Sequence, residues 1–230
     1  DQAQVRTAIE KAQPFIIYHC AAYTQVDAAE SDQATTRLVN VDGTENVAVA
    51  AEHVGAKLVV ISTDFVFDGR ATTPYREIDQ PYPLSVYGQT KWEGEQVAQS
   101  ICARTFVART AWLYGPSRAV APVNNFPLTM KRLARAEHPT GEAGQPHPSG
   151  VTIPEIRVVN DQVGSPTFTK DLAAAIIKLS DTEEYGLWHI ANDGQVSWYD
   201  VAREVLRDEI EHGRVSVTPI PSSDYPTAAQ

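Results

Sequence analysis

The sequence predicts an α/β fold in which a doubly wound parallel sheet carries a smaller lobe. Residues 58–61 form a run of Leu, Val and Ile without a charge, which is typical of a parallel strand buried on both faces. Segments with helical spacing of apolar residues alternate with such short runs, as in βαβ units. From Pro116 onward the chain changes character and becomes rich in proline and glycine, which indicates that a separate lobe begins there.

The composition suits one globular α/β domain with a small appended lobe, because the 230 residues are 43% hydrophobic and 21% charged. A formal net charge of −10 disfavours nucleic acid as a partner, since phosphates require a basic surface. We therefore expect small molecules or other protein chains as partners. Cys20 and Cys102 are too few for a disulfide framework or a zinc site, which favours reduced thiols in a cytoplasmic protein. The sequence shows no bilayer-spanning apolar run and no signal peptide, so we expect no membrane association.

The first part of the chain predicts elements that lead to one edge of the sheet. Helical spacing indicates helices over residues 5–12, 26–31 and 40–55, and apolar runs indicate strands over residues 15–18 and 58–61. Gly55 is expected to end the third helix, and Asn40 is expected to act as a helix cap.

The strand at residues 58–61 ends in two hydroxyls and a carboxylate, Ser62, Thr63 and Asp64. In open α/β sheets ligands bind at the carboxyl ends of the strands, so we expect the chemistry of this protein there. A loop with several prolines then brings the chain to a predicted helix over residues 87–103.

Tyr87 and Lys91 are four residues apart, which places them on one face of that helix. The pKa of a free phenol, about 10, is too high for ready proton exchange near neutral pH, and a nearby ammonium lowers it. We therefore expect Lys91 to tune Tyr87 as a proton donor to a carbonyl, with Thr63 holding the carbonyl oxygen. The alternative is an ordinary half-exposed helical pair, because Tyr and Lys at this spacing are common.

The second part of the chain predicts further elements in the same way. Strands are expected over residues 105–115, 156–159, 186–190 and 215–220, and helices over residues 128–133, 171–179 and after a Ser197 cap. Arg109 lies inside the first of these strands, so if buried it requires a partner and is expected to be structural.

Four blocks of sequence together resemble the dTDP-4-dehydrorhamnose reductase family of extended short-chain dehydrogenases/reductases. They are STDFVFDG at 62–69, PLSVYGQTKWEGE at 83–95, RTAWLYG at 109–115 and DQVGSPT at 161–167, in the family's order over most of the chain. The resemblance implies a Rossmann-like sheet and hydride transfer from NADPH or NADH to the 4-keto group of a dTDP-6-deoxy-hexulose, giving dTDP-L-rhamnose.

The resemblance also implies roles for individual residues. The implied catalytic residues are Tyr87, Lys91 and Thr63; the implied cofactor-binding residues are Ala22, Tyr23, Thr24, Tyr87 and Lys91; and the implied substrate-binding residues are Thr63, Asp64 and Trp112. Other interpretations stay open for three of them: Ala22 packs tightly, Asp64 binds backbone amides, or Trp112 belongs to the core.

The resemblance divides the chain into two parts. Residues 1–115 and about 156–180 would form the dinucleotide-binding part, and residues about 116–155 and 181–230 the substrate-binding lobe, with a Pro/Gly-rich insertion at 138–154. The Gly-rich fingerprint that cradles a diphosphate does not occur in this sequence. We therefore expect a fragment without its first βαβ unit and its C-terminal end, which binds dinucleotide poorly by itself.

Two alternatives to the reductase remain at this stage. One is an epimerase or dehydratase acting on a nucleotide sugar, although a dehydratase is expected to place an Asp–Glu pair after the strand-end hydroxyl, where this chain has Asp64 and Phe65. The other is a non-catalytic NADP-binding subunit like the regulatory β subunit of methionine adenosyltransferase. A homodimer is allowed, and Mg²⁺ is left open without support from any ligand cluster in the sequence.

Overall fold

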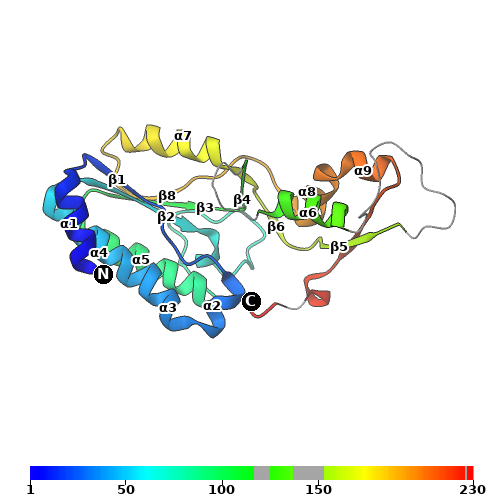
Figure 1. The fold of residues 1–230 in the computed structure, drawn as a ribbon, viewed down its shortest axis with the longest axis horizontal. Helices are drawn as coiled ribbons and strands as arrows, with labels where there is room; N and C mark the ends of the chain where they lie inside the picture. The colour runs from blue at the N-terminus through cyan, green and yellow to red at the C-terminus, as the bar shows by residue number, and fades with distance from the viewer. Residues whose placement is uncertain (117–124, 137–152, 226, 230) are drawn as a thin grey trace. The chain divides into compact units, whose positions relative to one another are not determined.

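The computed structural model describes residues 1–116, 125–136, 153–225 and 227–229. Its chain divides into two compact units, which we describe separately and whose elements are labelled in Figure 1. The first unit comprises Asp1–Ala111, Asp171–Ala191 and Thr227–Gln230, and the second comprises Trp112–Lys170 and Asn192–Pro226.

The first unit is built on a four-stranded sheet in the order β1-β2-β3-β8, with all neighbours parallel. The strands are β1 (Ile16–His19), β2 (Lys57–Thr63), β3 (Thr105–Thr110) and β8 (Gly186–His189). Because the strands are parallel, their carboxyl ends meet at one edge, where His19, Thr63 and Thr110 lie. The predicted parallel sheet is therefore confirmed.

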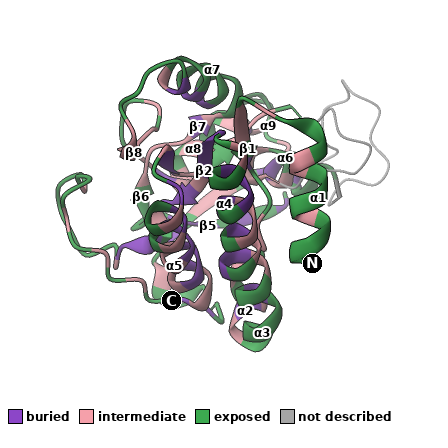
Figure 2. Cartoon of the chain, turned by 90° about the vertical axis from the view of Figure 1, so that its left-hand side faces the viewer, coloured by how far each residue is buried: buried purple, intermediate pink, exposed green. Residues whose placement is uncertain are grey.

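Helices cover both faces of this sheet, as a doubly wound fold requires (Figure 1). They are α4 (Gly43–Val54) and α5 (Val86–Ile101) on one face and α7 (Thr169–Ser180) on the other. The unit also contains α1 (Gln2–Ala12), α2 (Val26–Ser31), α3 (Gln33–Arg37), a π-helical turn at Leu38–Asp42 and a 3₁₀ turn at Asp64–Val66. Figure 2 shows buried residues along the sides of α4 and α5 and exposed residues on their outer sides.

The two faces of the sheet carry separate apolar clusters, because successive side chains of a strand point to opposite faces. On one face, Leu58 and Val60 of β2 pack with Ala48 of α4 and Ala98 of α5. On the other face, the cluster consists of Val59, Phe106, Ala108, Leu172 and Ile176, the last two from α7. Alternate side chains of the run at residues 58–61 thus pack into the apolar clusters on the two faces of the sheet.

The second unit contains three two-stranded sheets and its own apolar cluster. The pairs are β5 (Glu155–Val159) with β10 (Ser216–Ile220), β4 (Leu113–Tyr114) with β7 (Thr167–Phe168), and β6 (Val163–Gly164) with β9 (Val196–Ser197). The helices are α6 (Phe126–Ala136), α8 (Trp198–Val205) and α9 (Arg207–Glu211), with a 3₁₀ turn at Ser222–Asp224. Leu206, fully buried, lies in the cluster with Met130, Ile156, Val158 and Val215.

Several predicted boundaries differ from the structure. The strand expected over residues 105–115 breaks after Thr110, because Trp112 adopts a positive φ of 47° and the chain bends before β4. Residues 156–159 were expected with the dinucleotide-binding part, but β5 pairs with β10 in the second unit. Residues 186–189 were expected in the substrate lobe, but β8 pairs with β3 in the first unit. Most of the predicted insertion, residues 138–152, lies outside the described residues.

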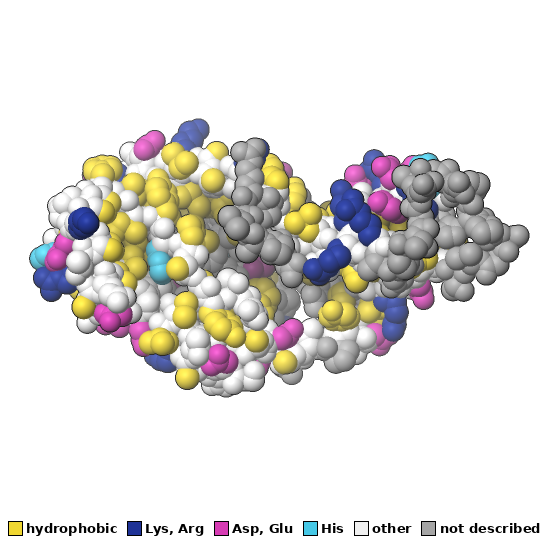
Figure 3. Space-filling view, viewed as in Figure 1, with side chains coloured by type: hydrophobic (Ala, Val, Ile, Leu, Met, Phe, Trp, Pro, Cys, Tyr) yellow, Lys and Arg dark blue, Asp and Glu magenta, His cyan; other side chains and the backbone are white. Residues whose placement is uncertain are grey.

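The surface in Figure 3 shows Lys and Arg side chains in small groups among Asp and Glu, with hydrophobic side chains spread between them. In the part of the chain that the structure describes, no helix has both the length and the apolarity needed to cross a membrane.

Candidate active site

The carboxyl end of β2 presents the hydroxyl of Thr63 in a defined orientation. Thr63 is the last residue of the strand, and its Oγ1 accepts a hydrogen bond from the amide of Phe65 at 3.2 Å and donates to Asp64 Oδ1 at 3.1 Å. The hydroxyl therefore caps the 3₁₀ turn that follows the strand. Ser62, one residue earlier, is also buried.

Helix α5 begins beside this turn and carries Tyr87 in its first turn. Ser85 is the N-cap, and its hydroxyl accepts from the amide of Gly88 at 3.1 Å. Gly88 is required by packing, since a Cβ at this position would lie 2.1 Å from the carbonyl oxygen of Phe65. The absence of a side chain thus lets the start of α5 press against the turn that carries Thr63.

The start of α5 places Tyr87 beside the turn that follows Thr63. Burial raises the pKa of Tyr87, a hydrogen bond with the Thr63 side chain opposes this, and the Asp64 carboxylate raises it further. The Phe65 ring meets the Tyr87 ring edge-on, with 5.5 Å between centroids. The pKa of Tyr87 therefore moves upward, opposite to the lowering expected from Lys91 alone, because desolvation of the phenolate dominates.

Lys91 lies one helical turn after Tyr87 and is only 5% exposed. Its Nζ donates to the carbonyl oxygen of Ile61 in β2 at 2.7 Å. Burial lowers the pKa of Lys91 to about 8, while Glu95 and Cys20 oppose this shift. The ammonium therefore remains the main form at neutral pH and is held against the strand that ends in Thr63.

Asp64 is half-buried beside the same turn. Burial raises the pKa of its carboxyl group, and hydrogen bonds with the Thr63 side chain and with the backbone of Asp64 and Phe65 oppose the shift. The hydroxyl of Thr63 donates to the carboxylate at 3.1 Å, and the backbone-binding alternative for Asp64 stays open. A contact with a sugar hydroxyl stays a prediction.

The loop after β1 places Ala22, Tyr23 and Thr24 at the same edge of the sheet, because β1 pairs in parallel with β2. Asn40 ties this loop to α5: its Oδ1 accepts from the amide of Tyr23 at 2.8 Å, and its Nδ2 donates to the carbonyl of Tyr23 and to Thr90 Oγ1.

Asn40 was predicted as a helix cap, and this prediction is wrong. The residue lies inside the π-helical turn, and its side chain binds other elements instead of the helix amides. The only sequence signal was a polar residue within an otherwise apolar helical pattern.

His19 at the end of β1 was not singled out from the sequence as a site residue. Its imidazole is buried, and its Nε2 lies 3.1 Å from Thr44 Oγ1. Burial, followed by the charge of Lys91, lowers the pKa of His19 to about 4. The side chain is therefore neutral near pH 7 and lies close to the predicted cofactor-binding loop.

Trp112 belongs to the second unit, where its ring stacks on Trp198 with 3.5 Å between centroids and 8° between planes. Gly164 makes room for the ring, since a Cβ there would lie 2.5 Å from Trp112 Cε2. The ring is thus held in a fixed orientation by its neighbours. Its predicted role in substrate binding stays a prediction.

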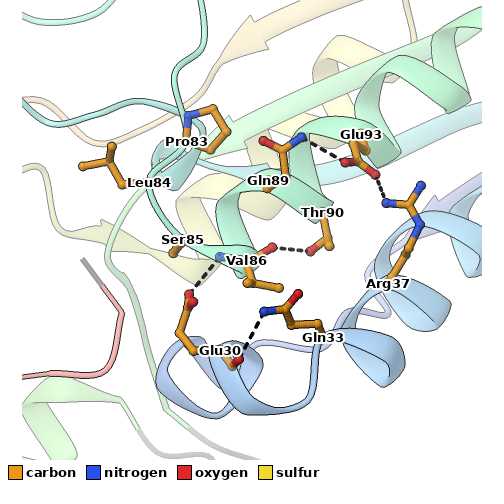
Figure 4. Close-up of a pocket in the computed structure, with 10 residues that line it drawn as sticks. All are labelled: Glu30, Gln33, Arg37, Pro83, Leu84, Ser85, Val86, Gln89, Thr90 and Glu93. Carbon is orange, nitrogen blue, oxygen red and sulfur yellow. Dashed lines mark hydrogen bonds and ion pairs between the residues drawn. The ribbon is translucent and has the colours of Figure 1, made fainter.

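A cavity of about 320 Å³ lies beside the N-terminal half of α5, facing α2 and α3 (Figure 4). It is lined by Glu30, Gln33, Arg37, Pro83, Leu84, Ser85, Val86, Gln89, Thr90 and Glu93, none of which is a predicted site residue. Glu30 Oε1 accepts from the amide of Val86 at 2.8 Å, which adds a second cap to the start of α5. Among the described residues, no group of three or more His, Cys, Asp or Glu is arranged to hold a metal ion.

The comparisons with known proteins agree with this geometry. A family model described as the RmlD substrate binding domain matches residues 1–230. The chain is 37% identical over 219 residues to the spore coat polysaccharide biosynthesis protein SpsK of Bacillus subtilis, covering 95% of this chain and 70% of that protein. It is 34% identical over 235 residues to dTDP-4-dehydrorhamnose reductase of Escherichia coli, covering 98% of this chain and 72% of the relative.

A crystal structure of dTDP-4-dehydrorhamnose reductase from Bacillus anthracis, in complex with NADP, superposes with a TM-score of 0.87 and 38% identity. The match covers 100% of this chain and 74% of that one. Since the family model spans the whole chain and the identities exceed a third over most of the relatives' length, the chain belongs to the RmlD family of dTDP-4-dehydrorhamnose reductases.

Proposed function

We propose that this protein reduces the 4-keto group of dTDP-4-dehydro-L-rhamnose with NADPH or NADH and gives dTDP-L-rhamnose. The observation that carries the proposal is that the start of α5 places Tyr87 beside Phe65, in the turn directly after Thr63, at the carboxyl edge of the sheet. Family membership supports the substrate class, since relatives with a third of their residues identical are named as reductases of this sugar nucleotide.

The residues at this edge fit a nicotinamide cofactor in their chemistry. The ammonium of Lys91 has three N–H donors, and one of them binds the carbonyl oxygen of Ile61. The others are left for hydroxyl groups of a ribose. The loop that contains Ala22, Tyr23 and Thr24 lies at the same edge of the sheet. One of its three side chains, that of Ala22, is small. When bound there, the cofactor supplies the hydride that adds to the carbonyl carbon.

Tyr87 supplies the proton that the reduction also needs. Its raised pKa keeps the phenol protonated at neutral pH, which is the form that donates. We propose that the Thr63 hydroxyl turns its hydrogen from Asp64 Oδ1 to the carbonyl oxygen of the substrate. The phenol transfers its proton to that oxygen, leaving a phenolate that solvent reprotonates. The ammonium of Lys91 favours this phenolate when it forms, because opposite charges stabilise each other in a buried site.

We assign dinucleotide binding to the first unit and propose contacts with the sugar nucleotide for Asp64 and Trp112. The other interpretations are not favoured: Phe65 follows Asp64 where a dehydratase is expected to carry Glu, and the named relatives are reductases. We also propose a cytoplasmic location, in keeping with the two free thiols of Cys20 and Cys102. A homodimer stays a proposal that light scattering would test.

The test is NAD(P)H oxidation with dTDP-4-dehydro-L-rhamnose by the protein and by Tyr87→Phe. We expect kcat to fall by about 10²–10⁴-fold, because the phenyl ring has no proton to give, while the variant still binds the cofactor. Tyr82→Phe is the matched control, since Tyr82 is 63% exposed. Equal rates for the protein and Tyr87→Phe would remove Tyr87 from the mechanism, and no oxidation by the unaltered protein would refute the function.

A further inference from the structure

Helix α5 carries a further polar residue, Glu95, which is buried on the face that bears Tyr87 and Lys91. Glu95 lies one turn beyond Lys91 and two turns beyond Tyr87, and it is only 2% exposed. A carboxylate buried to this extent requires partners for its oxygens. Its partners come from the sheet and not from the helix.

Glu95 joins α5 to two neighbouring strands. Arg109 of β3 donates from Nε to Oε1 at 2.9 Å and from Nη2 to Oε2 at 2.7 Å. Ser62 of β2 donates from Oγ to Glu95 Oε1. Ser62 and Arg109 are opposite each other in the parallel register of β2 and β3. One carboxylate thus connects the helix of Tyr87 to the residue just before Thr63.

The ion pair between Glu95 and Arg109 is expected to fix the orientation of the two groups more than to stabilise the fold. Replacing a buried ion pair by apolar side chains of similar size is often neutral or stabilising, because desolvation of the charges offsets their attraction. A bidentate contact between guanidinium and carboxylate, however, allows one orientation of the two groups. Phe67 supports that orientation, with the Arg109 guanidinium carbon 5.1 Å from its ring centroid. Apolar contacts alone would permit small rotations of α5 over the sheet.

We propose that Glu95, held by Arg109 and Ser62, is a positioning residue that sets the rotation of α5 and so keeps Tyr87 against Phe65 in the turn that follows Thr63. The proposal rests on the proposed function for its effect on turnover, but its geometric part stands on the structure alone. A change of about 1 Å in the place of a reacting group costs about a hundredfold in rate, so a small rotation matters.

The experiment compares two variants with a matched control. Glu95→Asp keeps the charge but shortens the side chain. The triple variant Ser62→Ala with Glu95→Leu and Arg109→Met removes all the polar groups together, so that none is left buried without a partner. Glu93→Gln is the control, because Glu93 lies on the same helix and pairs with another arginine, Arg37, at the exposed surface. Thermal stability, kcat, KM for the cofactor and the crystal structure of each variant are measured.

We expect the triple variant to keep its stability and its KM for the cofactor while kcat falls by about a hundredfold and the edge-on contact between the Tyr87 and Phe65 rings is lost. Glu95→Asp should lose kcat in the same direction, and Glu93→Gln should match the unaltered protein. If Glu95 and Arg109 serve only stability, the triple variant should match the unaltered protein in both stability and kcat. That result would overturn the proposal.

The outcomes separate this proposal from the proposed function. If the unaltered protein does not reduce the sugar nucleotide, the function fails and the crystal structures decide: a retained contact between the Tyr87 and Phe65 rings in the variants overturns the positioning role, and a lost contact supports it. If the triple variant does not fold, Glu95→Asp decides by the same contact and by kcat.

Discussion

At the scale of single residues, His19 shows how burial controls a charge beside the candidate site. The Thr44 hydroxyl donates to the carbonyl of Asn40 at 2.7 Å, so its oxygen accepts from His19 Nε2. This assigns the Nε2-protonated neutral tautomer to the imidazole. The positive charge of Lys91 disfavours a second positive charge on His19, so it lowers the pKa of His19 in addition to the effect of burial.

The lowered pKa of His19 predicts that the protein loses stability in acid. The folded-state pKa of about 4 lies below the ordinary 6.5, so the unfolded chain binds a proton between these values that the folded chain does not. The free energy of unfolding therefore falls as the pH drops from about 6.5 to about 4, by up to roughly 3 kcal/mol. Urea unfolding of His19→Gln, which keeps a donor toward Thr44, should show a smaller loss over this window.

The control for this measurement is His212→Gln, since His212 is exposed at the end of α9. Its pH profile of stability should follow that of the unaltered protein. If His19→Gln loses stability in acid as steeply as the unaltered protein does, carboxylates rather than His19 cause the loss.

At the scale of secondary-structure elements, α5 is the element on which the candidate site depends. Its start is capped twice, by Ser85 toward Gly88 and by Glu30 toward Val86, and its sheet-facing side carries Tyr87 and Lys91. Capping fixes where the helix begins, which determines how far Tyr87 lies from the end of β2. The cap is therefore part of the site's geometry as well as of the helix's stability.

Two serine caps provide a matched comparison. Ser85→Ala and Ser197→Ala each remove an N-cap hydroxyl, from α5 and α8 respectively, and each should lower the free energy of unfolding by about 1 kcal/mol. Only Ser85→Ala should also lower kcat, because only α5 carries Tyr87. Calorimetry and NAD(P)H oxidation measure the two effects. A similar kcat loss in both variants would contradict a specific role for the α5 cap.

At the scale of the whole molecule, the two units have separate apolar clusters. The clusters of the first unit lie on the two faces of the four-stranded sheet, and the cluster of the second unit gathers around Leu206. Because each unit has apolar clusters of its own, we expect the two units to differ in local stability.

Leu206→Ala tests this separation. Leu206 is fully buried, so the substitution should cost about 2–5 kcal/mol in the second unit, whereas Leu128→Ala, on the exposed side of α6, should cost little. Hydrogen exchange of Leu206→Ala should show a larger loss of protection in β5 and β10 than in β2 and β3. An equal loss in all four strands would show that the units unfold as one.

The order of the elements was predictable because it depends on local patterns. The buried run at residues 58–61, the helix of Tyr87 and Lys91, the helix at residues 171–179 and the Ser197 cap are all present in the structure. Spacing and capping residues determine these elements over a few turns of chain, so the pattern of side chains carries the information. The position of Thr63 at a strand end followed from the same pattern.

Strand partners and charges were decided by the tertiary structure. An apolar run does not reveal which strand it pairs with, so the places of β5 and β8 depended on packing across the whole chain. The bend at Trp112 is accompanied by stacking on Trp198, a residue distant in sequence. Asn40 likewise binds residues of two other segments.

The sequence by itself determined the fold class and the chemical groups at the end of β2 and the start of α5, because these follow from residue types at local spacing. Its resemblance to a known family came from four sequence blocks. Only the tertiary structure decided that burial raises the pKa of Tyr87 and that Glu95 joins α5 to the strand of Thr63. The physical reason is that desolvation and long-range hydrogen bonds depend on which surfaces meet, and local spacing does not specify that.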